Sequence, residues 1–528
     1  NNTGVCRLSA NAKAGQKITL RYGEWLKDGK LCLDNIRFAQ QSDLQKNFVQ
    51  KSEYICKDGN QTHTPSFIYN GFRYVLAEGI TEEQANANLL TYLKISSLPD
   101  CAGEFACSDE VINKIQEAAV RSDISNFNYF PTDCPQREKN GWTADASLSA
   151  EQMLLNLYPE KCYKEWMRSI YKALNDNGQL PGIIPTGGWG YHWGNGPAWD
   201  NVIINLPYFT YIYRGDKEIL EELSTPLMRY LNYLFSRLDK DGIMEIGLGD
   251  WCPPGVKEDE FKTPLAVTDT ILTYDIAVKS AFVYEVLGQQ PQRQFALAIA
   301  ERVKTAFREK LLNKETGEIK GGTQTGQAMA IYYGMLTDEE KPKALKLLIK
   351  YIADEDGHFY TGVLGGRVIY RVLAENGYID LAYNMIVRPD YPSYGNWIKR
   401  GATTLWEGFY PKGGRVLSLN HHFWGDISAW FYTYLAGIKI NPTGRDVTNV
   451  DIAPLFPEKL NSVCAHYDTP NGKIAINWER TDENSFILKI TAAEKLHGKI
   501  LLPEGFTFED GTHKAELKSG EFAIRKNT

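Results

Sequence analysis

Apolar residues recur at helical spacing through the middle of this 528-residue chain, from about residue 108 to about residue 437. Such a long helical run constrains the fold strongly, because each amphipathic helix must bury its apolar stripe against other helices. The first helix is predicted to start with Ser108 as its N-cap and to bury Val111, Ile112 and Ile115. Roughly a dozen helical segments are predicted, and the later ones span residues 144–157, 160–175, 201–213, 217–238, 268–287, 293–312, 325–333, 338–353, 364–376, 379–386 and 426–435.

The loops between these segments alternate in character. Some are short and charged, such as residues 215–216 and 336–338. Others are long and rich in Gly, Trp, Pro and His, and they span residues 130–142, 185–200, 248–255, 389–408 and 411–424. Long loops in compact domains usually carry function. The alternation predicts a ring of six helix pairs, an (α/α)6 barrel, with short turns at one end and functional loops at the other. A helical repeat array is the alternative, but no sequence repeats at a fixed period.

Both ends of the chain have strand patterns instead. Residues 17–22 and 71–76 alternate apolar and polar side chains, and helical periodicity first appears at residues 82–93. Residues 473–478 and 486–491 also alternate, with turn signals at residues 471–472 and 482–484. The predicted architecture is therefore multidomain and mainly α. A β-sandwich spans residues 1–102, the barrel spans 103–438, and a supporting antiparallel β-sandwich domain spans 439–528.

Composition excludes some classes of protein. The formal net charge is −7, with 58 basic and 65 acidic residues and no basic block that would indicate nucleic-acid binding. No apolar stretch is long enough for membrane insertion, and residues 1–20 lack the apolar core of a signal peptide. The chain opens directly in a strand-like segment, as a fragment or a processed form would. Nine cysteines without a C-x-x-C pair are compatible with a Cys101–Cys107 disulfide or with free thiols, so they do not indicate a compartment.

The segment Pro131–Ala146, PTDCPQREKNGWTADA, concentrates reactive side chains in a loop that leads into a helix: Asp133, Arg137, Glu138, Trp142 and Asp145. Acids can bind sugar hydroxyls, an arginine can orient a carboxylate, and a tryptophan can stack on a sugar ring. The alternative is ordinary helix capping, with Thr143 as N-cap and Asp145 in the first turn.

Glu407 is a second candidate acid, between aromatic residues in TTLWEGFY. Burial beside Trp406 would raise its pKa or require a partner, although a surface position at a helix end is an equal alternative. Other long loops add further aromatic and polar candidates: Trp189, Trp193, Trp199, Asp200, Asp250, Trp251 and His421. The 12 Trp, 30 Tyr and 22 Phe could stack on sugars or simply fill a large core.

Several chemistries lack their motifs. H-E-x-x-H, the phosphate-binding loop, the Rossmann glycine pattern and the G-x-S-x-G nucleophile elbow are all absent from the sequence. Carboxylate chemistry in an aromatic cleft remains, which is typical of glycoside hydrolysis.

These residues resemble a known family. DCPQREKNGWTAD at residues 133–145 is similar to the signature of the bacterial α-L-rhamnosidases of glycoside hydrolase family 78. The resemblance continues through the tryptophan loop to Asp200, GDW, TQTGQAMA, TTLWEGF and NHHFWG, and includes GFRYV near residue 71. It implies an (α/α)6 barrel flanked by β-domains and an inverting exo-hydrolase that releases terminal α-L-rhamnose.

The resemblance also implies residue roles. Glu138 matches the general acid and Glu407 the general base. Asp133, Arg137, Asp145 and Asp200 match residues that hold the sugar or orient the acid, Trp142, Trp193 and Trp251 match or lie near the apolar walls, and His421 matches a sugar-contacting histidine. Some family members have one more residue between the Gln-Arg and Gly-Trp pairs, so only Glu138 is available here. His422 and Phe423 replace a common Tyr and a small residue, which leaves open whether His421 or His422 faces the sugar.

No cofactor and no metal ion are expected. The expected partner is a rhamnose-containing glycoside or polysaccharide, without nucleic acid or membrane insertion, and a glycan-degrading enzyme is expected in the periplasm or outside the cell. Two other functions stay open. One is another activity on the same barrel, an exo-glycosidase or a lyase; a lyase would need a Tyr or His base and a more basic cleft. The other is a non-catalytic glycan-binding protein, which would need neither Glu138 nor Glu407.

Overall fold

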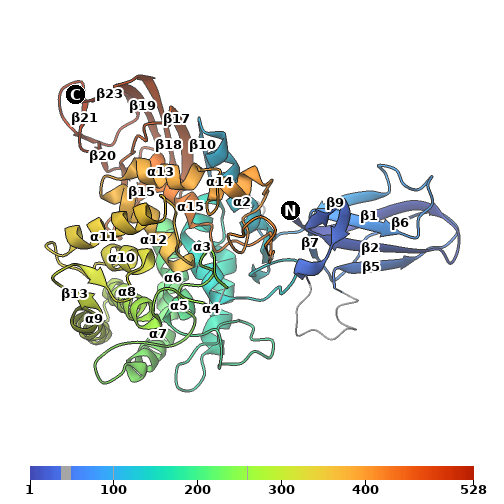
Figure 1. Cartoon of the computed structure of the whole chain (residues 1–528), viewed down its shortest axis with the longest axis horizontal. Helices are drawn as coiled ribbons and strands as arrows, with labels where there is room; N and C mark the ends of the chain where they lie inside the picture. The colour runs from blue at the N-terminus through green and yellow to red at the C-terminus, as the bar shows by residue number, and fades with distance from the viewer. Residues whose placement is uncertain (37–48, 99, 258–259, 415, 528) are drawn as a thin grey trace.

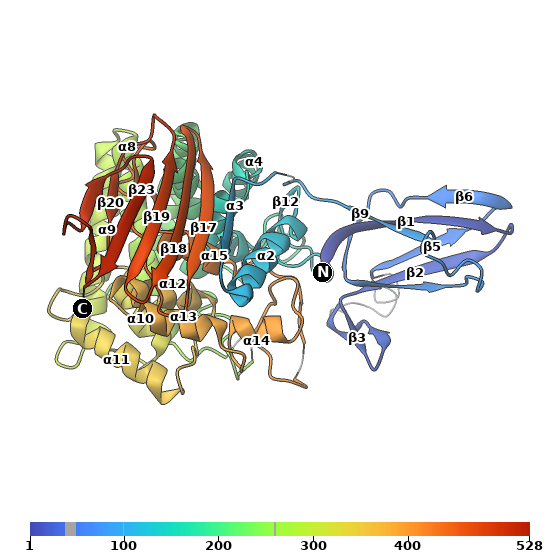
Figure 2. The ribbon, with the colours of Figure 1, turned by 90° about the horizontal axis from the view of Figure 1, so that it is seen from above.

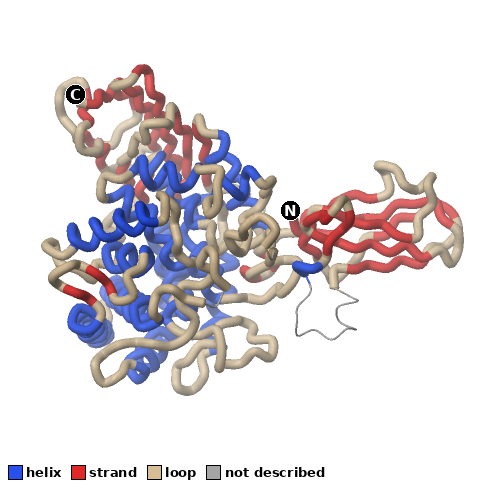
Figure 3. The backbone as a smooth tube through the Cα atoms, viewed as in Figure 1, coloured by secondary structure: helices blue, strands red, loops and turns tan. Residues whose placement is uncertain are grey.

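The computed structural model describes residues 1–36, 49–98, 100–257, 260–414 and 416–527. Arg415, in the long loop predicted at residues 411–424, lies outside this range. A helical body carries one β-domain at its side and a second against one of its faces (Figures 1 and 2). Figure 3 shows that nearly all the helix lies in the central body, with most of the strand at the two ends of the chain.

The N-terminal domain is a β-sandwich. In one sheet β1 (Asn2–Ala12) pairs with β6 (Gly59–His63), β7 (Asn70–Phe72) and β9 (Leu90–Lys94). In the other sheet, β2 (Lys17–Gly23) lies between β5 (Lys51–Ile55) and β8 (Tyr74–Glu78). Outside both sheets, β3 (Trp25–Lys27) and β4 (Lys30–Cys32) form a hairpin, and the short helix η1 (Asp34–Ile36) follows it. Alternate side chains of β1 and β2 fill the core between the sheets: Cys6, Leu8, Ile18, Leu20 and Tyr22.

Twelve helices in the described residues build the barrel, and they match the predicted segments to within a few residues. Six inner helices contact one another in a closed ring: α3 (Thr143–Asn156), α6 (Val202–Arg214), α8 (Leu265–Val286), α10 (Gln324–Tyr332), α12 (Val363–Glu375) and α15 (Asp426–Trp430), which continues as the π-helix η2 (Phe431–Leu435). Six outer helices cover this ring: α2 (Glu110–Ser125), α4 (Glu160–Ala173), α7 (Glu218–Arg237), α9 (Gln290–Lys310), α11 (Lys341–Asp354) and α13 (Ile379–Val387). The prediction of an (α/α)6 barrel is confirmed.

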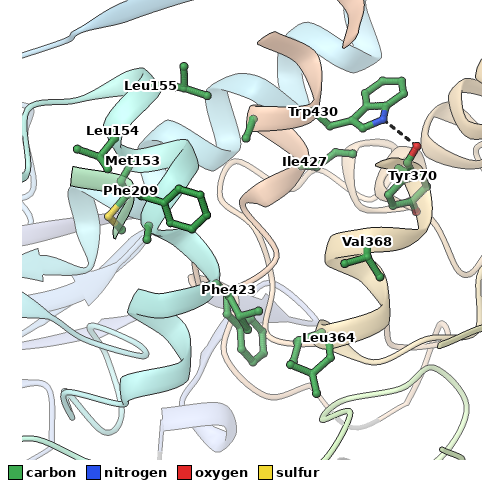
Figure 4. Close-up of a cluster of buried hydrophobic side chains, with 14 of the residues drawn as sticks. Met153, Leu154, Leu155, Phe209, Leu364, Val368, Tyr370, Phe423, Ile427 and Trp430 are labelled. Carbon is green, nitrogen blue, oxygen red and sulfur yellow. Dashed lines mark hydrogen bonds between the residues drawn. The ribbon is translucent and has the colours of Figure 1, made fainter. Parts of the chain in front are cut away.

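The burial of the helices explains which ring each one joins. Almost every side chain of α3 and α12 is buried, whereas α4 buries a single stripe, Tyr163, Trp166, Met167 and Ile170. A helix that is apolar on all sides suits the inside of the barrel, and an amphipathic helix suits the outside. Figure 4 shows side chains of α3, α6, α12 and α15 meeting in the core, where the Trp430 indole donates to the Tyr370 carbonyl at 3.0 Å.

The alternation of loops follows from this arrangement. Every loop that leads from an outer helix to the next inner helix lies at the end where the inner helices begin. These loops include the tryptophan loop with the short helix α5 (Pro197–Asp200), and residues 388–425 with the short helix α14 (Tyr394–Lys399). The returns from inner to outer helices are short. All the long loops therefore meet at one mouth of the barrel.

The C-terminal domain packs two sheets. β10 (Gly103–Cys107), β17 (Ser462–Thr469), β18 (Gly472–Asp482), β19 (Ser485–Ala492), β23 (Gly520–Lys526) and β21 (Phe506–Phe508) form one sheet in that order. The other contains β15 (Ile438–Ile440), β16 (Val450–Ile452), β20 (Lys499–Leu501) and β22 (Lys514–Glu516). Two short strand pairs remain within the barrel region: β11 (Phe127–Asn128) with β12 (Phe130–Pro131), and β13 (Leu312–Asn313) with β14 (Glu318–Ile319).

Some local predictions need correction. Residues 82–93 form turns and the start of β9 rather than a helix. The N-cap of α2 is Asp109, whose side chain accepts from Val111 N and Ile112 N, and not Ser108. The predicted boundary at residues 102–103 precedes β10, which pairs with β17 and so lies in the C-terminal sheet. All nine cysteines are free thiols, so the Cys101–Cys107 disulfide is not formed. Within the described residues, no helix combines the length and apolar character needed to cross a membrane.

Candidate active site

The long loops enclose a compact cavity of about 90 Å³ at the mouth of the barrel. Eight of the ten predicted site residues line it: Asp133, Glu138, Trp142, Asp145, Trp193, Trp251, Glu407 and His421. Residues that are more than 250 positions apart in the sequence therefore share one wall. Arg137 and Asp200, the other two predicted residues, lie outside the lining.

The loop before α3 presents Glu138 to this cavity. It is closed by two hydrogen bonds between the same residues: Asp133 N donates to Asn140 O at 3.0 Å, and Asn140 N donates to the Asp133 side chain, at Oδ1, at 2.9 Å. Lys139 adopts a positive φ of 56°, which turns the chain sharply after the acid. The Trp142 indole then donates to Glu138 Oε2 at 2.9 Å and orients this carboxylate.

Glu407 lines the same cavity. Its Oε2 accepts from Ser418 N at 2.8 Å, and its own backbone N donates to Ser418 O at 3.0 Å. Burial alone would raise the pKa of Glu407, but the charges of Arg137 and His421 and the Ser418 N–H lower it by more, so the net pKa is lowered. The carboxylate is thus held in its ionised form.

Arg137 connects the two candidate catalytic acids from behind the cavity. Its Nη2 lies 2.9 Å from Glu138 Oε1, and 3.1 and 3.0 Å from Glu407 Oε1 and Oε2. The side chains of all three residues are about nine-tenths buried. One guanidinium therefore faces two carboxylates in a site largely removed from water.

Asp133, Asp145 and His421 form the polar floor. His421 Nε2 lies 2.7 Å from Asp145 Oδ1, and His421 Nδ1 has no hydrogen-bond partner among the described residues. Burial raises the pKa of Asp133 well above its usual range, and the nearby carboxylates Glu138 and Asp145 raise it further. These groups can exchange hydrogen bonds with the hydroxyls of a neutral ligand.

The structure separates the two histidines that the sequence left open. His421 lines the cavity, whereas His422 is fully buried behind it between Ser149 Oγ at 2.8 Å and the Thr132 carbonyl at 2.9 Å. Burial lowers the pKa of His422 to about 4, so this ring stays neutral. His421 is the histidine available to a ligand, and His422 connects its own loop to α3 and to the loop before α3.

Tryptophans form the other side of the cavity. Trp193 meets Trp142 edge to face at 5.3 Å between ring centroids, and Trp251 at 6.3 Å. Trp189 stacks on Trp193 at 5.5 Å, and these two rings are 37% and 43% exposed at the cavity mouth. The carboxylate of Asp250 accepts from three backbone N–H groups at the start of α12, those of Gly362, Leu364 and Gly365. These hydrogen bonds attach the loop to α12 and so hold the neighbouring Trp251 in position.

Asp200 does not reach the cavity wall. It is fully buried at the end of α5, its Oδ2 accepts from the Tyr230 hydroxyl at 3.1 Å, and burial raises its pKa well above the usual range. Thr143 does not serve as an N-cap, because it is the first residue of α3 and its hydroxyl donates to the Gly182 carbonyl at 3.0 Å. Asp145 does lie in the first turn of α3 as well as in the cavity.

Four further residues line the cavity: Trp189, Trp199, Leu248 and Phe423. Trp189 and Trp199 are among the aromatic candidates of the long loops, and Phe423 lies in NHHFWG. Leu248 is an ordinary apolar residue, and only its position just before GDW could have indicated it. Ser418 acts through its backbone N–H, for which the sequence carries no signal.

One group among the described residues has the spacing of potential metal ligands: Asp133, Cys134 and His421, whose ligand atoms lie within 4.8 Å of one another. The Cys134 thiol instead donates to Asp133 Oδ2 at 2.8 Å. Burial raises the pKa of this thiol well above its usual value, so it stays protonated and is a poor ligand. Together these contacts favour a polar wall for a sugar over a metal site.

Three family models match this chain, one for each part of the fold. The family model described as the bacterial alpha-L-rhamnosidase 6 hairpin glycosidase domain matches residues 100–435. Models of the bacterial alpha-L-rhamnosidase concanavalin-like domain and C-terminal domain match residues 1–96 and 440–513.

Individual relatives extend the match to the whole chain. An alpha-L-rhamnosidase of Formosa agariphila is 30% identical over 546 residues, which cover 100% of this chain and 56% of the relative. The structure of alpha-L-rhamnosidase from Dictyoglumus thermophilum superimposes with a TM-score of 0.89 at 28% identity, over 100% of this chain and 61% of that one. The Streptomyces avermitilis alpha-L-rhamnosidase complexed with L-rhamnose gives a TM-score of 0.89 at 25% identity, over 99% of this chain and 51% of that one.

This chain spans a little over half the length of the curated relatives that it matches. Within that span, the barrel and both flanking β-domains agree with the three family models. The chain therefore belongs to the bacterial α-L-rhamnosidase family.

Proposed function

We propose that this chain is an exo-acting glycoside hydrolase that releases terminal α-L-rhamnose, with Glu138 as general acid and Glu407 as general base. The observation that carries the proposal is the pair of buried carboxylates that share Arg137 at the floor of a tryptophan-lined cavity. A compact cavity suits one terminal sugar. Its acids, Asp133 and Asp145, suit hydroxyl groups, and its tryptophans suit the apolar C6 methyl group.

The contacts assign different roles to the two carboxylates. A single guanidinium neutralises one negative charge, so a proton is most easily taken up by the carboxylate that it holds less tightly. Glu407 has two contacts with Arg137 and accepts from the Ser418 N–H, whereas Glu138 has one contact with Arg137, accepts from the Trp142 indole and lies 3.5 Å from Asn140 Nδ2. Because Arg137 contacts Glu407 twice and Glu138 once, Glu407 is the carboxylate suited to the base, and Glu138 is the group proposed to protonate the leaving oxygen.

The reaction then needs two proton transfers. Glu138 donates its proton to the glycosidic oxygen while Glu407 takes a proton from the water that attacks the anomeric carbon on the other face. The two carboxyl groups are ~6.5–9.5 Å apart in inverting enzymes and ~5–5.5 Å apart in retaining enzymes. In this chain Glu138 and Glu407 contact the same Arg137 nitrogen, so their nearest oxygen atoms are less than about 6 Å apart. This value is an upper limit on one oxygen–oxygen distance, so the anomer released first decides between inversion and retention.

A proton NMR time course with p-nitrophenyl α-L-rhamnopyranoside tests the proposal. We expect β-L-rhamnose to appear first and to mutarotate afterwards, because inversion transfers the water to the opposite ring face. Release of α-L-rhamnose first would make Glu407 a nucleophile and the inverting mechanism wrong. If no sugar is released, other α-L-glycosides and then the binding-only function become the alternatives.

The pH dependence of kcat/KM should show the ionised state of Glu407. The base works only while ionised, so activity persists as the pH falls and is lost below the lowered pKa of this carboxyl. The acidic limb should therefore lie below the usual glutamate value of about 4.3. Arg137→Met should move that limb to higher pH, because burial then acts without its main opposing charge. If the acidic limb of kcat/KM stays at the same pH in Arg137→Met, the assignment of Glu407 as the base is contradicted.

Rhamnose-containing glycosides or polysaccharides are the proposed substrates, and the periplasm or the cell exterior is the proposed location, because such glycans are found there.

A further inference from the structure

The N-terminal β-sandwich contributes one carboxylate to the region directly behind the proposed base. Glu24 lies between β2 and β3, and its side chain is only 2% exposed. It contacts the barrel loop of residues 417–419, almost 400 positions away in the sequence. The two domains therefore meet at a buried polar contact and not only at an apolar surface.

Glu24 and Asn35 bind the backbone of this loop on both sides of Ser418. Glu24 Oε2 accepts from Leu419 N at 2.9 Å and from Asn35 Nδ2 at 2.6 Å. Asn35 Nδ2 also lies 3.0 Å from the Leu417 carbonyl, to which it donates. Two residues of the sandwich thus anchor the residues before and after Ser418.

Ser418 is the residue of this loop that touches the base. Its N–H donates to Glu407 Oε2, and its carbonyl accepts from Glu407 N. Three residues later, His421 N donates to the Leu405 carbonyl at 2.9 Å, so the segment of residues 417–421 runs antiparallel to residues 405–407. A shift of residues 417–419 would move the donor to the base, whereas the hydrogen bond to the Leu405 carbonyl holds the cavity histidine in place.

The environment of Glu24 argues against a purely stabilising role. Burial raises its pKa to about 7, although the Leu419 N–H, Asn35 and Arg137 act in the opposite direction. An acid with a raised pKa in the folded state destabilises the fold at neutral pH. An apolar side chain of similar size would fill the same space at less cost, but it could not accept the Leu419 N–H.

We propose that Glu24, assisted by Asn35, is a positioning residue for the catalytic base: it anchors Leu417–Leu419 so that the Ser418 N–H stays on Glu407. The inference rests on the proposed function, in which Glu407 activates water. It assigns to the β-sandwich a direct part in arranging the active site of the barrel.

The test compares Glu24→Leu, Glu24→Gln and the control Glu78→Leu in the full chain. Glu78 is a glutamate of the same sandwich, and its carboxylate accepts from Arg21 at the surface, far from the loop. Glu24→Leu should lower kcat roughly tenfold with KM within about twofold, because a hydrogen bond to the base is weakened while the sugar contacts remain. Glu24→Gln keeps one acceptor oxygen and should restore most of kcat, and Glu78→Leu should match the wild type.

The pH profile separates positioning from general damage. The Ser418 N–H helps to lower the pKa of Glu407, which is also faced by Arg137 and His421. Glu24→Leu should therefore move the acidic limb of kcat/KM to higher pH, in the same direction as Arg137→Met. A lower kcat with an unmoved limb and no restoration by Gln would overturn the proposal, because a merely structural defect behaves that way.

Hydrogen exchange provides a readout that does not depend on turnover. Amide exchange in peptides that cover residues 417–421 should be faster in Glu24→Leu than in the wild type and in Glu78→Leu, and Asn35→Ala should show a smaller increase. Unchanged exchange in this segment overturns the positioning role. Absence of turnover in the wild type, with faster exchange in Glu24→Leu, instead means that the proposed function fails while the anchoring role holds.

Discussion

Glu138→Gln is expected to lower kcat for an alkyl α-L-rhamnoside by about 10²–10⁴-fold, the usual contribution of general acid catalysis. Gln has the shape of Glu and can still accept from the Trp142 indole, but it has no proton to give to the leaving oxygen. The affinity for L-rhamnose, measured by calorimetry, should stay within a few-fold because the cavity walls are unchanged.

The leaving group supplies an internal control. p-Nitrophenol departs with little protonic assistance, so its rhamnoside should lose less rate in Glu138→Gln than the alkyl rhamnoside. Glu165→Gln, a change on the exposed side of α4, serves as the matched variant and should behave as the wild type. If Glu138→Gln hydrolyses the alkyl rhamnoside at the wild-type rate, another residue is the acid.

Arg371→Met is expected to destabilise the barrel by about 3–5 kcal/mol, the usual effect of removing one partner from a buried ion pair. The guanidinium of Arg371, on α12, donates from Nε and Nη2 to Asp426 of α15 at 2.8–3.0 Å. It also reaches Glu151 of α3 at 2.9 Å, so it connects three helices of the inner ring. Methionine would fill the space but leave the two buried carboxylates with the more distant Arg367, at 3.5 and 3.9 Å, and the Tyr213 hydroxyl on Glu151.

Urea denaturation followed by tryptophan fluorescence measures this effect as a lower transition midpoint. Arg168→Met is the matched control, because Arg168 pairs with Glu222 on the exposed surface and its loss should shift the midpoint little. A midpoint for Arg371→Met equal to that of the control would mean that the buried network contributes no net stability. In that case the closed ring would depend on apolar packing alone.

The barrel was predictable because its signal is local. Each helix is marked by apolar residues three and four positions apart, and the strongly periodic segments all form helices. The helical periodicity misled only at residues 82–93, where apolar residues at helical spacing belong to turns and to the start of β9. The position of β10 was not predictable either, because its partner β17 lies more than 350 residues away.

The candidate site was predictable as a set of residues but not as an arrangement. Loop composition and family resemblance indicated Glu138, Glu407 and the tryptophans. The bridge formed by Arg137 between the two acids and the burial of Asp200 against Tyr230 depend on how the barrel closes.

The sequence by itself determined the helical barrel, the flanking strands and the chemical character of the loops at its mouth, because periodicity and composition act over a few residues. Only the tertiary structure decided that His421 rather than His422 faces the cavity, and that Glu24 reaches the loop behind Glu407. The physical reason is the same in both cases. Hydrogen bonds between residues hundreds of positions apart form only after the ring has closed and the β-sandwich has docked, so no short stretch of sequence contains them.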